Sequence, residues 1–142
     1  PARDATIAGL AAQVIESPLA AEGMGASLRA AMTAISPEAD AVLIALADMP
    51  DLKAQDHAAM IAAFDPAEGR EIVHAASPEG VPGNPVLFGR RFFESLRVLE
   101  GDEGARHILA AHSDLIRLVT ISGAAVDLDA PEDWEAWRAK QE

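Results

Sequence analysis

Residues 41–50 read Ala-Val-Leu-Ile-Ala-Leu-Ala-Asp-Met-Pro, and this stretch is the best local signal in the chain. Positions 41–46 are continuously apolar, which is typical of a strand buried on both faces of a parallel sheet. Asp48 and Pro50 follow at its carboxyl end, where open α/β sheets bind their ligands. A carboxylate there can hold Mg²⁺ against a phosphate, but an Asp in an Asp-x-Pro turn fits the local pattern equally well.

Strand and helix patterns alternate along the rest of the chain. Strands are predicted at 14–16, 71–75, 86–88, 115–119 and 125–128. Helices are predicted at about 27–35, 54–64, 90–99 and 103–111, and from Pro131 onward, because proline favours the first helical position. This alternation predicts an α/β fold, a three-layer sandwich with a mostly parallel sheet. No linker or repeat divides residues 1–142, so we expect one domain.

The bulk composition excludes several classes of function. The net charge of −12 argues against a nucleic-acid surface, which needs clustered Lys and Arg. The chain has no cysteine, which excludes disulfides and thiolate metal sites. No apolar run is long enough to cross a bilayer, so we expect a cytoplasmic protein with no membrane partner. An acidic protein that binds a polyanionic nucleotide would need a divalent metal and local arginines.

Gly23 to Leu28 form a glycine-bearing loop that opens a helix. A nucleotide could approach bare backbone there, and the start of the helix would offer free N–H groups. The segment lacks the Gly-x-x-x-x-Gly-Lys pattern of a P-loop. A flexible turn in which Ser27 caps the helix is the alternative interpretation.

Two further loops contain candidate binding residues. Residues 81–85 form a proline-rich loop before an apolar strand, where Asn84 could donate to a ligand. An ordinary connection is the alternative. Residues 101–106 place Asp102 and Arg106 around a helix start, so Arg106 could bind a phosphate. A surface pair of Asp102 with Arg106 is the alternative, since the two residues are four apart.

Asp127 and Asp129 share one side of the last predicted strand near its end. Paired carboxylates at a strand terminus suit a metal ion. Asp129 equally fits the cap region of the helix that Pro131 opens.

The order of these segments carries more information than any one of them. Together they resemble the MobA-like nucleotidyltransferases, and within that family the molybdenum cofactor cytidylyltransferases. The resemblance covers nearly the whole chain and rests on five motifs: Gly-Met-Gly-Ala-Ser-Leu (23–28), Leu-Ala-Asp-Met-Pro (46–50), Pro-Gly-Asn-Pro-Val-Leu-Phe (82–88), Gly-Asp-x-Gly-Ala-Arg (101–106) and Asp-Leu-Asp-x-Pro-Glu-Asp (127–133). The third and fourth motifs favour the cytidylyl branch over the guanylyl branch.

The resemblance implies a Rossmann-like fold and transfer of CMP from CTP to the phosphate of a molybdopterin-type cofactor, with release of pyrophosphate. It implies Mg²⁺ as cofactor, and a molybdenum hydroxylase or its maturation factor as a possible protein partner. It also assigns roles to individual residues. The catalytic and metal-binding residue would be Asp48, the other metal residues Asp127 and Asp129, the nucleotide-binding residues Gly23, Gly25, Ser27 and Leu28, and the acceptor-binding residues Gly83, Asn84, Pro85 and Arg106.

The chain departs from the family pattern in two places. Ala130 stands where the family usually has Thr. The family's first strand and its basic, glycine-rich loop are not found, so the chain matches the C-terminal two-thirds of such a domain. We therefore expect an uncovered sheet edge or apolar face, and little or no catalysis by residues 1–142 alone.

Two other functions fit the same residues. One is a related nucleotidyltransferase that uses another nucleotide or another phosphate acceptor. The other is a non-catalytic protein that binds the molybdenum cofactor or inserts it into a hydroxylase. That second function would use the loops at 82–88 and 101–106 but would not need the Asp48 carboxylate.

Overall fold

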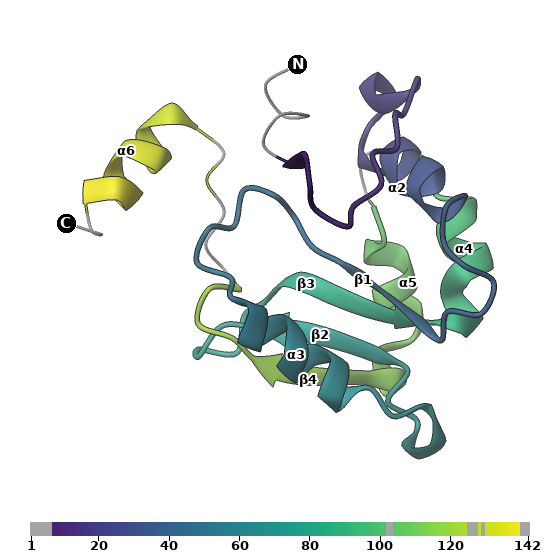
Figure 1. Cartoon of the computed structure of the whole chain (residues 1–142). Coiled ribbons are helices and arrows are strands. Elements are labelled where there is room, and N and C mark those ends of the chain that lie inside the picture. The colour runs from purple at the N-terminus through teal and green to yellow at the C-terminus, as the bar shows by residue number, and fades with distance from the viewer. Residues whose placement is uncertain (1–6, 102–103, 125–127, 129, 140–142) are drawn as a thin grey trace.

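The computed structural model describes residues 7–101, 104–124, 128 and 130–139 (Figure 1). In chain order its elements are η1 (Ala20–Glu22), α2 (Met24–Met32), β1 (Ala41–Ile44), α3 (Ala54–Ala63), η2 (Pro66–Glu68), β2 (Ile72–Ala76), β3 (Pro82–Gly89), η3 (Arg90–Phe92), α4 (Phe93–Arg97), α5 (Arg106–Ala111), η4 (Ser113–Leu115), β4 (Ile116–Thr120) and α6 (Pro131–Ala139). None of the helices in this described part is both long and apolar enough to cross a membrane.

The four described strands form one mixed sheet in the order β1-β3-β2-β4. β3 pairs antiparallel with both β1 and β2, whereas β2 and β4 pair in parallel. Three of the four strands therefore run in one direction, as expected for an α/β sheet. β3 runs the opposite way between two of them, so β2–β4 is the one parallel pairing among the described strands.

Alternate residues of the two central strands face opposite layers of helices, as the pleat of a strand requires. Ile72 and Phe88 pack in one core with residues of α2, α4 and α5. Val73 and Leu87 pack in a second core with Met60 of α3. Figure 1 shows α3 on one face of the sheet and α2, α4 and α5 on the other. The predicted three-layer α/β sandwich is confirmed.

Two of the predicted strands, 14–16 and 125–128, correspond to none of the described strands. Residues 14–16 form no strand, and the side chain of Val14 is 56% exposed. That prediction is wrong because a strand needs a paired neighbour for its N–H and C=O groups, and none of the described strands pairs with this short segment. The strand predicted at 125–128 falls mainly on residues 125–127, which lie outside the described residues.

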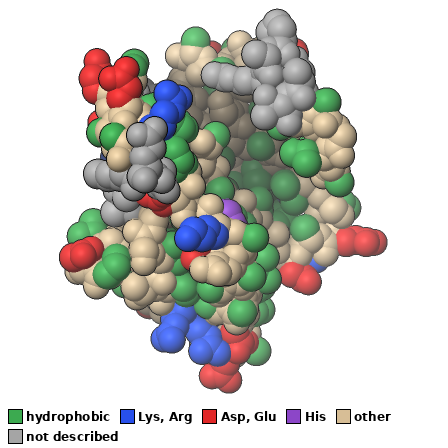
Figure 2. Space-filling view, turned by 60° about the vertical axis from the view of Figure 1, so that its left-hand side comes forward, with side chains coloured by type: hydrophobic (Ala, Val, Ile, Leu, Met, Phe, Trp, Pro, Cys, Tyr) green, Lys and Arg blue, Asp and Glu red, His purple; other side chains and the backbone are tan. Residues whose placement is uncertain are grey.

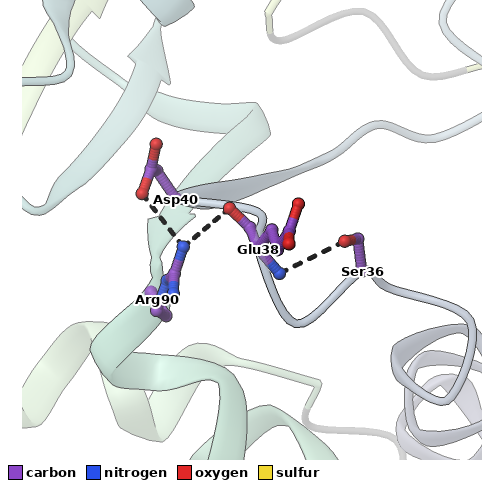
Figure 3. A network of polar contacts seen from close by, with 4 residues as sticks. All are labelled: Ser36, Glu38, Asp40 and Arg90. Carbon is purple, nitrogen blue, oxygen red and sulfur yellow. Dashed lines mark hydrogen bonds and ion pairs between the residues drawn. The ribbon is translucent and has the colours of Figure 1, made fainter.

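A polar network joins the start of β1 to the end of β3 (Figure 3). The Arg90 guanidinium donates to the Glu38 carbonyl at 2.7 Å and to Asp40 Oδ1 at 3.1 Å. The Glu38 N–H in turn donates to Ser36 Oγ at 3.2 Å. Because this network lies where β1 begins, it supports the β1–β3 register from the edge of the sheet opposite to the carboxyl end of β1.

We expect Met60→Ala to lower the free energy of unfolding by about 2–4 kcal/mol, because deletion of a buried Met side chain leaves a cavity. Met60 is fully buried beneath the sheet, whereas Ile61 beside it on α3 is 61% exposed. The matched control Ile61→Ala should change the free energy of unfolding by no more than about 0.5 kcal/mol. Urea unfolding measures both, and equal losses would contradict the assignment of Met60 to the second core.

Candidate active site

The sheet topology brings several chain segments to one edge. The carboxyl ends of β1, β2 and β4 meet there because these three strands run the same way. β3 runs opposite, so its first residues lie at the same edge, with Pro82 paired to Ala76 and Val86 paired to Ile44. The loop after β1 therefore faces the start of β3, which is the usual place for a ligand in an open α/β sheet.

A cavity of about 270 Å³ opens at this edge. Its walls come from α2, from β1 and the loop after it, from β2 and β3, and from the segment that begins α5. The residues that line it are Met24, Leu28, Ile44, Leu46, His74, Pro82, Gly83, Asn84, Val86, Phe88, Gly104, Ala105, Arg106 and Leu109. Figure 2 shows one face of the molecule hollowed, with hydrophobic side chains over much of the hollow and a histidine and basic side chains at its margin.

The charges on the cavity wall differ from those of the chain as a whole. The chain carries 23 Asp and Glu residues and a net charge of −12. Among the described residues that line the cavity none is acidic, and the titratable ones are His74 and Arg106. A largely apolar wall with a guanidinium and an imidazole suits an anionic ligand that also has an apolar or aromatic part.

His74 lies in β2 directly opposite Val86 of β3. Its side chain is half-buried, and burial lowers the pKa of His74 below the ordinary value of 6.5. A hydrogen bond from the imidazole to the Gly83 main chain partly opposes this shift. The imidazole is therefore biased toward its neutral form, and an anionic ligand nearby would favour the protonated form.

Asp48 lies two residues beyond Leu46, which lines the cavity. Its Oδ1 atom is buried and makes no hydrogen bond within the described structure. Its main-chain carbonyl accepts a hydrogen bond from the Leu128 N–H at 3.0 Å. A buried carboxylate oxygen without a donor is costly, and a hard cation such as Mg²⁺ is a partner it can bind. The donor chemistry at Asp48 therefore fits the implied metal.

The described residues alone do not complete a metal site. No group of three or more His, Asp or Glu residues suited to a metal occurs among them. Asp127 and Asp129, the other two residues assigned to the metal, lie outside the described residues. The residue between them, Leu128, makes the hydrogen bond to the Asp48 carbonyl.

The cavity brings together four of the residues that the motifs assigned to substrates: Leu28, Gly83, Asn84 and Arg106. Gly23, Gly25, Ser27 and Pro85 are not among its lining residues. The helix α2 begins at Met24, so Gly23 is its N-cap and Ser27 is an exposed residue inside the helix rather than its cap. A Cβ on Gly25 would lie 2.9 Å from the Gly101 carbonyl oxygen, so this glycine allows close packing against main chain. Pro85 is fully buried.

His74 is a lining residue to which the motif order assigned no role. The sequence does single out this position, because His74 is a titratable residue within an otherwise apolar strand. Two positions from Ile72, it lies on the same face of the strand as Ile72. Met24 and Ala105 also line the cavity. Both stand within the motifs at 23–28 and 101–106, but only their positions in the folded chain bring them to the cavity wall.

Comparison of the sequence with known proteins identifies a protein family. The sequence matches the MobA-like NTP transferase domain over residues 1–115. It is 32% identical over 123 residues to the purine catabolism protein PucB of Bacillus subtilis (strain 168), a match that covers 84% of this chain and 58% of PucB.

Solved structures with similar folds come from mycobacteria. The Rv0371c homologue from Mycobacterium sp. strain JC1 superposes with a TM-score of 0.68 at 25% identity, covering 92% of this chain and 60% of that one. Rv0371c from Mycobacterium tuberculosis H37Rv gives 0.68 at 26% identity, covering 82% and 60%. Its complex with manganese gives 0.64 at 25% identity, covering 78% and 58%. This chain thus spans about three-fifths of the length of these relatives.

We expect His74 to make the protein less stable as the pH falls below about 6.5. Since the pKa of His74 is lowered in the native state, the unfolded chain takes up a proton there that the native chain does not. The free energy of unfolding therefore decreases across this window. His74→Gln removes this contribution, so the variant should lose less stability than the wild type between about pH 7 and pH 5, as measured by urea unfolding. Parallel pH profiles would contradict the burial of a neutral imidazole.

Proposed function

The chain belongs to the MobA-like NTP transferase family, and from this premise we propose that the protein transfers CMP from CTP to the phosphate of a molybdopterin-type cofactor. Pyrophosphate is the second product. The assignment of CTP and of the acceptor rests on the motifs at 82–88 and 101–106, which resemble the cytidylyl branch of the family.

The observation that carries this proposal is the buried Oδ1 of Asp48, which has no hydrogen-bond partner among the described residues. Asp48 follows two residues after Leu46, which lines the cavity. A carboxylate in this state is poised to accept a cation, which a triphosphate brings with it. The mycobacterial Rv0371c, which has a similar fold, has been crystallised with manganese. We propose that Asp48, together with Asp127 or Asp129, holds Mg²⁺ against the nucleotide phosphates. When bound, the ion would neutralise phosphate charge during the transfer.

The acceptor is proposed to lie along the wall formed by the start of β3 and the start of α5. Arg106 supplies the positive charge for the acceptor's phosphate, since a guanidinium binds phosphate oxygens in pairs. Asn84 supplies amide groups for the polar edge of a ring system, and Phe88 and Leu109 supply apolar surface. The nucleotide would lie toward Leu28 of α2.

The proposed reaction needs no covalent intermediate on the protein. An oxygen of the acceptor's phosphate forms a bond to the α-phosphorus of CTP. The bond from that phosphorus to the bridging oxygen breaks, and pyrophosphate leaves with the electron pair. The contribution of the chain is to align the two substrates and to place positive charge near their phosphates, which together provide most of the rate enhancement in such transfers.

We expect Asp48→Asn to lower kcat by a factor of about 10² or more, because the loss of a charge-stabilising group at a transfer site has effects of this size. Pyrophosphate release from the full-length protein with CTP, Mg²⁺ and molybdopterin measures it. Asp114→Asn is the matched control, since Asp114 is exposed in η4 and does not line the cavity. Unchanged delivery of cofactor by Asp48→Asn would instead favour the non-catalytic cofactor-binding protein, which does not need this carboxylate.

The nucleotide and acceptor are tested separately by supplying each NTP in turn, with and without molybdopterin. CTP together with molybdopterin should give pyrophosphate release at least about tenfold faster than any other pair, a preference worth about 1.4 kcal/mol. A preference for GTP, or release that does not depend on molybdopterin, would overturn the proposed substrates and favour a related nucleotidyltransferase.

A further inference from the structure

The C-terminal helix α6 contacts the loop that carries Asp48. Trp137 Nε1–H donates a hydrogen bond of 2.8 Å to Asp51 Oδ1, and the two residues are 86 positions apart in the sequence. Asp51 stands three residues after Asp48, in the turn between β1 and α3. Figure 1 shows α6 away from the helices that cover the two faces of the sheet. Its contact with this loop is therefore separate from the two cores.

A second tie joins α6 to Asp48 through Leu128. Trp134 Nε1–H donates to the Leu128 carbonyl at 3.1 Å. The Leu128 N–H donates to the Asp48 carbonyl at 3.0 Å. The two indole rings pack edge to face, with centroids 6.1 Å apart and planes at 74°. The two indole rings therefore pack against each other. The Trp137 N–H bonds the Asp48 loop directly, and the Trp134 N–H is linked to it through Leu128.

The turn after β4 packs against the same loop from another side. A Cβ on Gly123 would lie 3.1 Å from both the main-chain carbon and the Cβ of Asp51, a tight contact that the glycine avoids. The loop also closes on itself, because the Leu52 N–H donates to the Met49 carbonyl at 3.3 Å. The Asp51 side chain is held in addition by its hydrogen bond from Trp137.

We propose that Trp137 and Asp51 are positioning residues that hold the Asp48 loop ready for a divalent cation. This inference rests on the proposed binding of Mg²⁺ at Asp48. A carboxylate on a loop binds a cation more tightly when the loop is already ordered, because less conformational entropy is lost on binding. Groups that orient a metal ligand in this way commonly change metal affinity by about 10–100-fold when they are removed.

The coupling between the cation and α6 is reciprocal. Because the docked helix favours the cation, the cation must favour the docked helix by the same factor. The chain contains two Trp residues and no Tyr, and both tryptophans, Trp134 and Trp137, are in α6. Intrinsic fluorescence excited at the indole band therefore reports the state of this helix alone.

The test titrates the protein with MgCl₂ alone and follows tryptophan emission, with calorimetry as an independent measure of the dissociation constant. The wild type should show a saturable change in emission. Asp51→Ala and Trp137→Phe should each bind Mg²⁺ about tenfold more weakly. Asp51→Asn should bind within about threefold of the wild type, because the amide oxygen still accepts the Trp137 N–H although the charge is gone.

Each outcome separates this inference from the function on which it rests. If Asp51→Ala and Trp137→Phe bind Mg²⁺ as tightly as the wild type, the inference is wrong and the proposed function stands. If Asp51→Asn binds as weakly as Asp51→Ala, the charge rather than the hydrogen bond acts, and the inference is again wrong. If the wild type does not bind Mg²⁺, or Asp48→Asn binds it equally well, the metal assignment and the inference both fail. Should Asp51→Ala not fold, Trp137→Phe on the peripheral helix carries the test, with Trp134 as its probe.

Discussion

β3 is hydrogen-bonded on both sides, to β1 and to β2, and the site depends on this antiparallel pairing. Its reversed direction places the first residues of β3 where β1 and β2 end, so Asn84 meets the cavity reached by the loop that leads to Asp48. The same register turns His74 and Phe88 to the cavity side and Leu87 to the core beneath α3. A slip of one residue would exchange these faces, and would remove the cavity wall together with both cores.

The site contains one of the two buried side-chain polar atoms that lack a hydrogen-bond partner among the described residues; the other is Arg70 Nε. The Asp48 Oδ1 atom is buried without a hydrogen-bond donor among the described residues, although buried polar atoms are nearly always paired. Such violations are expected where a ligand completes the structure. The loop around Asp48 is held by Leu128, by the turn at Gly123 and by Trp137. Contacts from distant segments of the chain therefore hold this loop in place, in addition to the packing of Leu52 against the second core.

Much of the architecture could be predicted from local pattern. The apolar run from residue 41 forms a strand, Pro131 begins a helix, and Asn84 and Arg106 line one cavity. The loop predicted at 81–85 is wrong in part, because Pro82 to Pro85 already belong to β3, which pairs with β2 at Pro82. The local pattern could not predict the roles of Gly25 and Ser27. The sequence does not distinguish a glycine that contacts a nucleotide from one that packs against the main chain of residues 100–101, as Gly25 does. The strand at 14–16 failed for a similar reason, since a strand exists only if a partner lies beside it.

The periodicities, the alternation of strands with helices and the position of Asp48 just beyond an apolar strand follow from the amino-acid sequence alone. These properties are local, because they depend on side chains within a few residues of one another. The burial of that strand on both faces does not follow from the sequence, because β1 lies at the edge of the described sheet and is half-buried. Three other features follow from the folded chain: β3 lies reversed between β1 and β2, His74 lines the cavity, and Trp137 bonds Asp51 across 86 positions. These features depend on which segments, far apart in the sequence, pack against one another and exclude water. A local pattern of residues does not specify which distant segment it will pack against.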